Sequence, residues 1–258
     1  MTIKNKSHIN ENISDTKIED SYGIDYLTWK NWGSESSCFG KLTTADAAYY
    51  SAELKRSSTS FPPNCKVLEI GFGNGSFLTY AKVKLWDIFG VEINKDLVTA
   101  AIKNNFNVIH SDNLISYNDD FFDLIVAFDV LEHIPQKDLT LFINEVKRIL
   151  KKGGVFVARF PNGDSPFGLM NQNGDITHVT TLGSGKVHYF AAQCGMDVVF
   201  IGGEAQPLFV KSPLHFSHRL ISLPIKFILN MITKLLFFPR TKISFYSHNL
   251  TLIYKKPN

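Results

Sequence analysis

"KVLEIGFGNGSFL", residues 66–78, decides the fold of this chain of 258 residues. A short apolar run leads into three alternating glycines, Gly71, Gly73 and Gly75, and a helix-like segment starts at Ser76. Glycines between a strand and a helix let the backbone turn tightly and approach a ligand closely. The stretch therefore predicts a strand, a ligand-binding turn and a helix.

The sequence on both sides of this turn alternates between strand-like and helix-like segments. Strands are predicted at 66–70, 87–92, 108–110, 124–128, 155–160, 198–201 and 248–256. Helical periodicity fits 76–83, 95–104, 139–150 and 186–193, and the third of these helices is expected to end at the basic "KKGG" turn. This alternation predicts an α/β fold with a mainly parallel seven-stranded sheet and helices on both faces.

The chain divides into two parts by composition. Residues 1–60 are expected to form an N-terminal tail and an aromatic helical lid, with a helix from Ala45 capped by Thr44. Residues 61–258 form the main domain, and 203–247 are a basic, apolar insertion before the last strand. The aromatic side chains expected to cover the ligand are Tyr26, Trp29, Trp32, Tyr49 and Tyr50.

Two ligands suit a glycine turn of this kind, a nicotinamide dinucleotide and S-adenosylmethionine (SAM). The dinucleotide fingerprint requires Gly or Ala at the position of Ser76, and Glu69 would repel a pyrophosphate. The sulfonium and ammonium groups of SAM suit this carboxylate better. Glu92, at the end of the second strand, can accept hydrogen bonds from the ribose of either ligand. Asp112, after the third strand, is placed to meet an adenine amino group.

Five motifs together resemble the class I SAM-dependent methyltransferases. They are "VLEIGFGNG", "GVEIN", "SDN", "FDLIVAFDVLEHIP" and "LKKGGVFVARFPN", in this order between about Lys66 and Asn162. The "DVLEHIP" form is similar to ubiquinone-biosynthesis O-methyltransferases. The segment "RFPNGDSPFGLMNQNGDITH" resembles enzymes of bacterial surface-polysaccharide clusters. The resemblance implies a Rossmann-like class I methyltransferase fold and a transferase of EC class 2.1.1, with SAM as cofactor.

The resemblance also implies roles for the residues that match its motifs. Those expected around the methionine part of SAM are Glu69, Gly71, Phe72, Gly73 and Gly75. Glu92 would hold the ribose, and the adenine would lie against Ile93, Asp112 and Asn113. Phe128 and Asp129 would lie beside the sulfonium.

Transfer of a methyl group to a hydroxyl requires a base, and histidine is the side chain best suited to that role near neutral pH. His133 follows the fourth strand, and His178 closes the long polar loop after the fifth, with Asp175 three residues earlier. We expect His178 to be the base, Asp175 to orient its ring and His133 to line the pocket. The spacing of Asp164, Asp175 and His178 matches no metal motif, so we expect no metal.

The composition indicates a cytoplasmic protein, because the N-terminus has no apolar leader and the three cysteines are scattered. From Lys211 to the end the chain has no Asp or Glu. Its basic charge would suit a solvated surface, a phosphate-bearing substrate or an anionic membrane, and no nucleic-acid-binding motif accompanies it. We expect an apolar helix within 215–240. Burial against the domain, a homodimer interface and peripheral contact with the inner face of a membrane all suit it, whereas Pro224, Lys226, Asn230 and Lys234 oppose a membrane span.

The sequence therefore predicts a SAM-dependent O-methyltransferase that acts on a small-molecule or glycan-type hydroxyl, as in polysaccharide biosynthesis. Two alternatives stay open at this point. One is an NAD-dependent oxidoreductase, and the other is a non-catalytic SAM-fold binding protein at a membrane surface.

Overall fold

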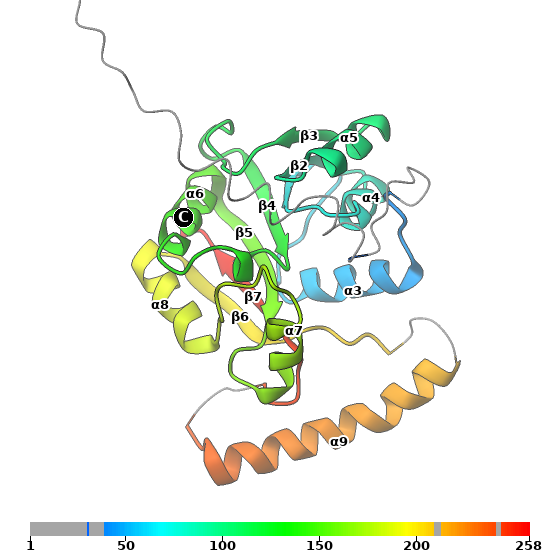
Figure 1. The fold of residues 1–258 in the computed structure, drawn as a ribbon, viewed down its shortest axis with the longest axis vertical. Helices are drawn as coiled ribbons and strands as arrows, with labels where there is room; N and C mark the ends of the chain where they lie inside the picture. Colours follow the sequence, from blue (N-terminus) through cyan, green and yellow to red (C-terminus); the bar gives the residue numbers. More distant parts are fainter. Residues whose placement is uncertain (1–29, 31–38, 209–212, 241–243) are drawn as a thin grey trace, which may run out of the picture.

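The computed structural model of the chain contains one sheet of seven strands (Figure 1). It describes residue 30 and residues 39–208, 213–240 and 244–258. The strand order is β3-β2-β1-β4-β5-β7-β6. The strands are β1 (Lys66–Ile70), β2 (Asp87–Glu92), β3 (Asn107–His110), β4 (Phe122–Phe128), β5 (Leu150–Pro161), β6 (Asp197–Gly203) and β7 (Asn249–Lys255).

The sheet is parallel except at one edge. β3, β2, β1, β4 and β5 are parallel, and β7 lies antiparallel between β5 and β6. The strand order reverses between β1 and β4: β1 is followed by β2 on one side, and β4 is followed by β5 on the other. Ligands bind beyond the carboxyl ends of the strands at such a point. The predicted α/β fold and its mainly parallel sheet are confirmed.

Alternate residues of the central strands face the two sides of the sheet, and both sides are buried. Leu68 and Ile125 pack on one side with helices α6 (Leu139–Ile149) and α8 (Ser184–Cys194). Val67 and Val126 pack on the other side with α3 (Thr44–Lys55) and α4 (Ser76–Val83). A third cluster joins α4 to α5 (Lys95–Lys103). Burial on both faces explains why these strands read as continuous apolar runs.

Two predicted boundaries were wrong. The first helix is capped by Thr43, not Thr44, because the Thr43 side chain accepts from Asp46 N and the Asp46 carboxylate accepts from Thr43 N. The "KKGG" segment does not end the third helix as a turn. It lies within β5, which starts at Leu150 and pairs there with Phe122 across an irregularity in the β4–β5 register.

α3 is an integral part of the domain. Tyr50 contacts Phe77 and Phe128, with ring centroids 5.1 and 5.4 Å away. The Glu53 carboxylate is fully buried and accepts hydrogen bonds from Thr251 Oγ1 and from the backbone N of Ala205. The lid predicted from Tyr26, Trp29 and Trp32 lies outside the described residues.

The insertion between β6 and β7 contains the long helix α9 (Pro213–Phe237), which lies along the lower side of the molecule in Figure 1. No described residue of this helix is buried, so the structure does not support burial against the domain, one of the three settings that the sequence left open. Its segment Phe216–Phe237 has the length and apolar composition of a membrane-crossing helix. Two short elements, η2 (Pro166–Gly168) and α7 (Leu169–Asn173), follow β5.

Candidate active site

The glycine turn after β1 has the backbone that only glycine adopts easily. Gly71, Gly73 and Gly75 have φ angles of 65°, 50° and 75°. A Cβ on Gly71 would lie 2.7 Å from Val130 Cγ2, and one on Gly75 would lie 2.5 Å from the Phe39 ring. Side chains therefore close in on the turn at Gly71 and Gly75, and neither position has room for a Cβ.

Glu92 ties this turn to the end of β2. One oxygen of its buried carboxylate accepts a hydrogen bond from Gly73 N at 3.1 Å, and the other accepts from Ile93 N and Asn94 N at 2.8 and 3.0 Å. Burial raises the pKa of Glu92, and these three hydrogen bonds partly offset the rise. The carboxylate predicted to hold the ribose thus also fixes the shape of the turn.

Glu69, near the carboxyl end of β1, is a buried carboxylate with an unsatisfied oxygen. Within the described part of the chain, its Oε2 atom has no hydrogen-bond partner, and neither does Ser76 Oγ. Burial, together with the charge of Glu92, raises the pKa of Glu69 well above its usual range. A buried carboxylate oxygen without a partner is costly unless a cation or a donor meets it. The ammonium and sulfonium of SAM are such groups, so these residues fit that cofactor.

The other predicted cofactor residues lie near the same edge in different settings. Phe72 is buried in the core between α4 and α5 and contributes to the site through its backbone. Ile93 is partly exposed just after β2, and its carbonyl contacts His110 Nε2 at 2.8 Å. Asp112 and Asn113 are exposed in the loop after β3, where the Asn113 amide donates to the Asp112 carboxylate. A polar rim therefore adjoins the Glu92 turn, as the adenine assignment requires.

Phe128 and Asp129 occupy the carboxyl end of β4. The Phe128 ring packs against Tyr49 and Tyr50 of α3, with centroids 6.1 and 5.4 Å away. Asp129 has a φ of 58°, which is uncommon outside glycine, and its carboxylate accepts from Arg159 Nε at 2.8 Å. The Arg159 guanidinium also lies over the Tyr49 ring, 5.2 Å from its centroid.

The second half of the site forms where η1 (Leu131–His133) meets the loop before α8. Val179 N and Thr180 N both donate to the backbone carbonyl of Glu132, at 2.9 and 3.0 Å. These bonds hold the loop against η1, so that His133 and His178 come together with ring centroids 4.7 Å apart. The structure therefore brings the three predicted catalytic residues, Asp175, His133 and His178, into one cluster.

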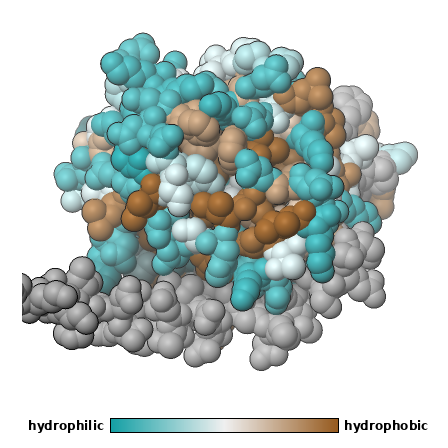
Figure 2. Space-filling view, turned by 90° about the horizontal axis from the view of Figure 1, so that it is seen from above, coloured by the Kyte–Doolittle hydropathy of each residue, from teal (hydrophilic) through white to brown (hydrophobic). Residues whose placement is uncertain are grey.

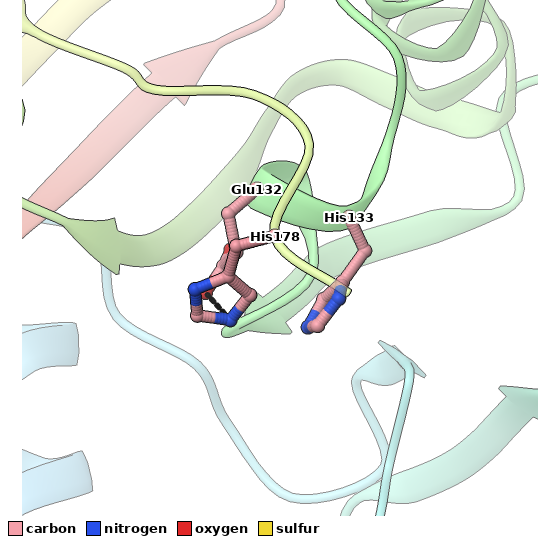
Figure 3. Close-up of side chains that lie close together, drawn as sticks. All are labelled: Glu132, His133 and His178. Atoms are coloured by element: carbon pink, nitrogen blue, oxygen red, sulfur yellow. Dashed lines mark ion pairs between the residues drawn. The ribbon is translucent and has the colours of Figure 1, made fainter. Parts of the chain in front are cut away.

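Glu132 itself is the most buried charged group of this cluster. Its residue is 1% exposed, and within the described residues neither carboxylate oxygen has a hydrogen-bond partner. Burial, and the charge of Asp129, raise the pKa of Glu132 well above its usual range. Figure 3 shows the carboxylate beside the His178 ring, and Glu132 Oε1 is 3.8 Å from His178 Nε2.

The contacts of His178 identify its basic nitrogen. Its Nδ1 atom is 3.2 Å from the backbone carbonyl of Gln172, which can only accept, so Nδ1 carries the proton in the neutral ring. Nε2 is then the nitrogen that can accept a proton, and it lies 3.7 Å from Asp175 Oδ2. The ring is thus oriented by Gln172 and not, as predicted, by Asp175.

Asp175 instead supports the loop and His133. Its carboxylate accepts from Thr177 N and Thr177 Oγ1 at 3.0 and 2.6 Å and pairs with Lys30 Nζ at 2.8 Å. Burial opposes its ionisation, but these partners outweigh burial and hold the pKa of Asp175 well below its usual range. Thr177 Oγ1 in turn lies 3.0 Å from His133 Nδ1. Burial and His178 lower the pKa of His133 to about 4, so this ring is neutral near pH 7.

Three side chains of the cluster also have the composition of a metal site. The ligand atoms of Glu132, His133 and His178 all lie within 4.8 Å of one another, although the sequence led us to expect no metal. However, the Lys30 ammonium pairs with Asp175 beside them and acts electrostatically on both Glu132 and His133. A fixed cation beside the group disfavours a dication there, so proton transfer is the chemistry that this arrangement supports best.

Three residues of the site were not assigned a role from the sequence. Glu132 stands in the quoted motif "DVLEHIP" next to His133, and that motif was the available signal. Arg159 lies on β5, and only its pairing with Asp129 reveals it. Lys30 is more than a hundred residues from Asp175 in the sequence, so no local pattern predicts their ion pair.

Comparisons with known proteins identify the family of the chain. The family model "Methyltransferase domain" matches residues 43–194, more than half of the chain. An uncharacterized protein of Methanocaldococcus jannaschii is 32% identical over 124 residues, which are 47% of this chain and 56% of that protein. The chain thus spans little more than half the length of this curated relative.

Solved structures share the fold over most of the chain. A SAM-dependent methyltransferase from Archaeoglobus fulgidus is 25% identical, with a TM-score of 0.60 over 81% of this chain and 94% of that one. A phosphoethanolamine N-methyltransferase of Haemonchus contortus, in complex with S-adenosylhomocysteine, is 15% identical, with a TM-score of 0.62 over 95% of this chain and 61% of that one. With the unsatisfied carboxylate of Glu69, these findings favour SAM over a dinucleotide. The chain belongs to the class I SAM-dependent methyltransferase family, and its cofactor is S-adenosylmethionine.

Proposed function

We propose that the protein transfers the methyl group of SAM to a hydroxyl of a small-molecule or glycan-type acceptor, with His178 as general base. When bound, SAM supplies a methyl group on a sulfonium, whose leaving group is neutral. The chain must then hold the acceptor oxygen in line and remove its proton. The observation that carries the proposal is the His178 ring, whose Nδ1 faces the Gln172 carbonyl and whose Nε2 is left as the basic atom.

The surroundings of Nε2 support this role. Glu132 and Asp175 place carboxylate oxygens 3.8 and 3.7 Å from it, so an imidazolium formed during the reaction has two counter-ions at hand. The ring side chain is only 7% exposed, which limits exchange with bulk water. His133, kept neutral by burial, contacts the same ring edge-on and limits its movement.

A hydroxyl-bearing acceptor is supported by a second unsatisfied group. Gln172 Oε1 is buried and, among the described residues, has no hydrogen-bond partner. A side-chain carbonyl oxygen can only accept, so it suits a hydroxyl group of the acceptor. Gln172 also holds His178 through its backbone, and one residue would thereby position both the base and its substrate.

The substitution His178→Gln tests the proposal. We expect kcat to fall by about 10²–10⁴-fold while SAM affinity, measured by calorimetry, stays within about twofold. The matched control is His188→Gln, because His188 is an exposed histidine on α8 outside the cluster. Product formation is followed by mass spectrometry of hydroxyl-bearing acceptors incubated with enzyme and SAM.

Near-normal turnover of His178→Gln at saturating acceptor would remove His178 from this role. Assays after chelation separate the base from a metal mechanism at the same three side chains. Full activity in metal-free buffer supports the base, whereas loss of activity and its recovery on adding a divalent cation would contradict it. SAM binding without methylation of any hydroxyl-bearing acceptor would favour a non-catalytic SAM-binding protein instead.

A further inference from the structure

Helix α9 has its polar and apolar faces reversed relative to a helix packed on a core. Its half-buried positions are mostly polar: six of the eight are Arg219, Ser222, Lys226, Asn230, Thr233 and Lys234, and the other two are Phe216 and Leu223. The exposed positions between them carry large apolar side chains, among them Ile221, Ile225, Ile228, Ile232 and Leu235. An amphipathic helix normally turns its apolar stripe toward the protein. Here that stripe faces outward.

Polar contacts join the inner face of α9 to the two chain segments that flank the helix within the insertion. Asn230 Oδ1 accepts from Phe245 N at 2.9 Å, and Thr233 Oγ1 lies 3.2 Å from the Tyr246 hydroxyl. Near the other end of the helix, Arg219 donates to the backbone carbonyl of Pro207. These contacts fix which face points outward, so the exposed apolar stripe is a defined surface and not the result of a freely rotating helix.

The charge on this part of the chain has one sign. No Asp or Glu occurs after Glu204, whereas α9 carries Arg219, Lys226 and Lys234. An anionic lipid surface supplies both an apolar layer and the opposite charge, and helices that lie in such an interface carry their lysines and arginines on the polar face opposite the inserted apolar stripe, as α9 does.

The site and the helix are connected on the same side of the molecule. β4 and β5 point toward the lower side of Figure 1, where α7 and α9 lie. Ser165 Oγ donates to the Phe245 carbonyl, and the Phe167 ring lies 5.3 Å from that of Tyr246. Apolar side chains are exposed here too, since Met170 is 71% and Ile176 95% exposed. Figure 2 views the molecule from the side opposite α9 and shows an apolar band across the middle of that face, surrounded by hydrophilic residues.

We propose that α9 lies in the plane of an anionic membrane surface, with the stripe around Ile221, Ile228 and Leu235 inserted among the lipids and the domain above it. A helix in this orientation keeps its contacts with Phe245 and Tyr246, whereas a spanning helix would have to break them. The inference does not depend on the proposed methyl transfer, because it is carried by the surface of α9 alone.

Co-sedimentation of the full chain with vesicles tests the proposal. We expect binding to vesicles that contain phosphatidylglycerol and weak binding to pure phosphatidylcholine. In the double variant Ile228→Gln/Leu235→Gln, the partition coefficient should fall about a hundredfold, because two inserted side chains become polar. The matched control is Ile115→Gln/Leu141→Gln, which changes two equally exposed apolar residues outside α9 and should bind like the original protein.

A tryptophan reporter provides a second readout that does not depend on losing binding. Trp at position 228 (Ile228→Trp) should be quenched by lipids brominated in their acyl chains, whereas the control Leu141→Trp should not. No sedimentation with any vesicle, or a lipid-independent dimer that the double variant makes monomeric, would overturn the proposal. Quenching at both positions, 228 and 141, would contradict the assignment of the α9 stripe as the surface that enters the lipids.

Discussion

The two halves of the site hold a buried carboxylate in different ways. Glu69 stands on β1 in the middle of the sheet, where its neighbours are fixed by pairing with Gly90 and Val126. Glu132 stands on a single turn of 3-10 helix, and its backbone is fixed by Val179 and Thr180, from a loop beyond β5. The first carboxylate is positioned by the sheet and the second by a long-range loop contact. Cofactor binding and proton transfer should therefore respond separately to substitution.

We call the part of the site around Glu69 and the glycine turn the cofactor half. Gly71→Ala should produce the largest effect there. An alanine must adopt a φ of 65°, and its Cβ would meet Val130 Cγ2 at 2.7 Å. We expect a loss of about 2–4 kcal/mol in the free energy of unfolding and at least a hundredfold loss in SAM affinity. Urea denaturation and calorimetry measure the two. The control Gly185→Ala has open space around the new Cβ and should leave both nearly unchanged.

Glu132→Gln should affect the other half alone. The amide cannot become a counter-ion for His178, so we expect kcat to fall about 10–100-fold. SAM affinity should stay within about twofold, because the Glu69 turn is untouched. The control is Glu145→Gln on α6, whose carboxylate pairs with Arg148 outside the cluster. Equal losses of kcat and SAM affinity in Glu132→Gln would show that the two halves are not separable.

Glu69→Gln tests the cofactor half through charge. Loss of one charge-assisted contact should weaken SAM binding about tenfold or more, with little change in kcat at saturating SAM. It should also change the pH dependence of stability. Because the folded-state pKa of Glu69 is raised, the unfolded chain loses this proton first as pH rises above about 4.3. Stability should therefore fall with rising pH in the ligand-free protein, and less steeply in the variant, as urea midpoints would show.

His133 should give the smallest effect, and of the opposite sign. Its pKa is about 4 in the folded protein and near 6.5 in an unfolded chain. The unfolded state thus takes up the proton first on acidification, and the stability that depends on a neutral ring is lost as pH falls from about 6.5 to 4. We expect about 1–2 kcal/mol, since the residue is half-buried. In His133→Gln, the urea midpoint should depend less on pH between about pH 4 and 6.5 than it does in the original protein. An unchanged slope would contradict the assignment.

The cofactor half was predictable from the sequence because it is built from local turns. The strand before Gly71, the helix from Ser76 and the carboxylate of Glu92 lie within about 25 residues, and each has its own pattern of glycine, polar and apolar positions. Phe72 was assigned to the cofactor because it stands between two glycines. The structure places its side chain in the core, since the turn needs only its backbone there.

In the half of the site around Glu132 and His178, the residues were predictable from the sequence but their contacts were not. His178 and Asp175 stood out as a pair three residues apart, which suggested that one orients the other. The fold instead turns Asp175 to Lys30 and Thr177, and Gln172 holds His178 through its backbone carbonyl. Backbone acceptors and partners far along the chain leave no trace in local spacing. Which face of α9 points outward could not be predicted for the same reason, because the partners of Asn230 and Thr233 are known only from the fold.

Glu53 gives the insertion a firm connection to the rest of the protein. Its carboxylate joins Ala205, the residue at which the chain departs toward α9, to Thr251 on β7. Arg56, one turn further along α3, pairs with Glu53 and also donates to the Gly203 carbonyl. Glu53 thus links the start of the insertion to α3 and β7 and, through Tyr50, which contacts Phe128, to the carboxyl end of β4.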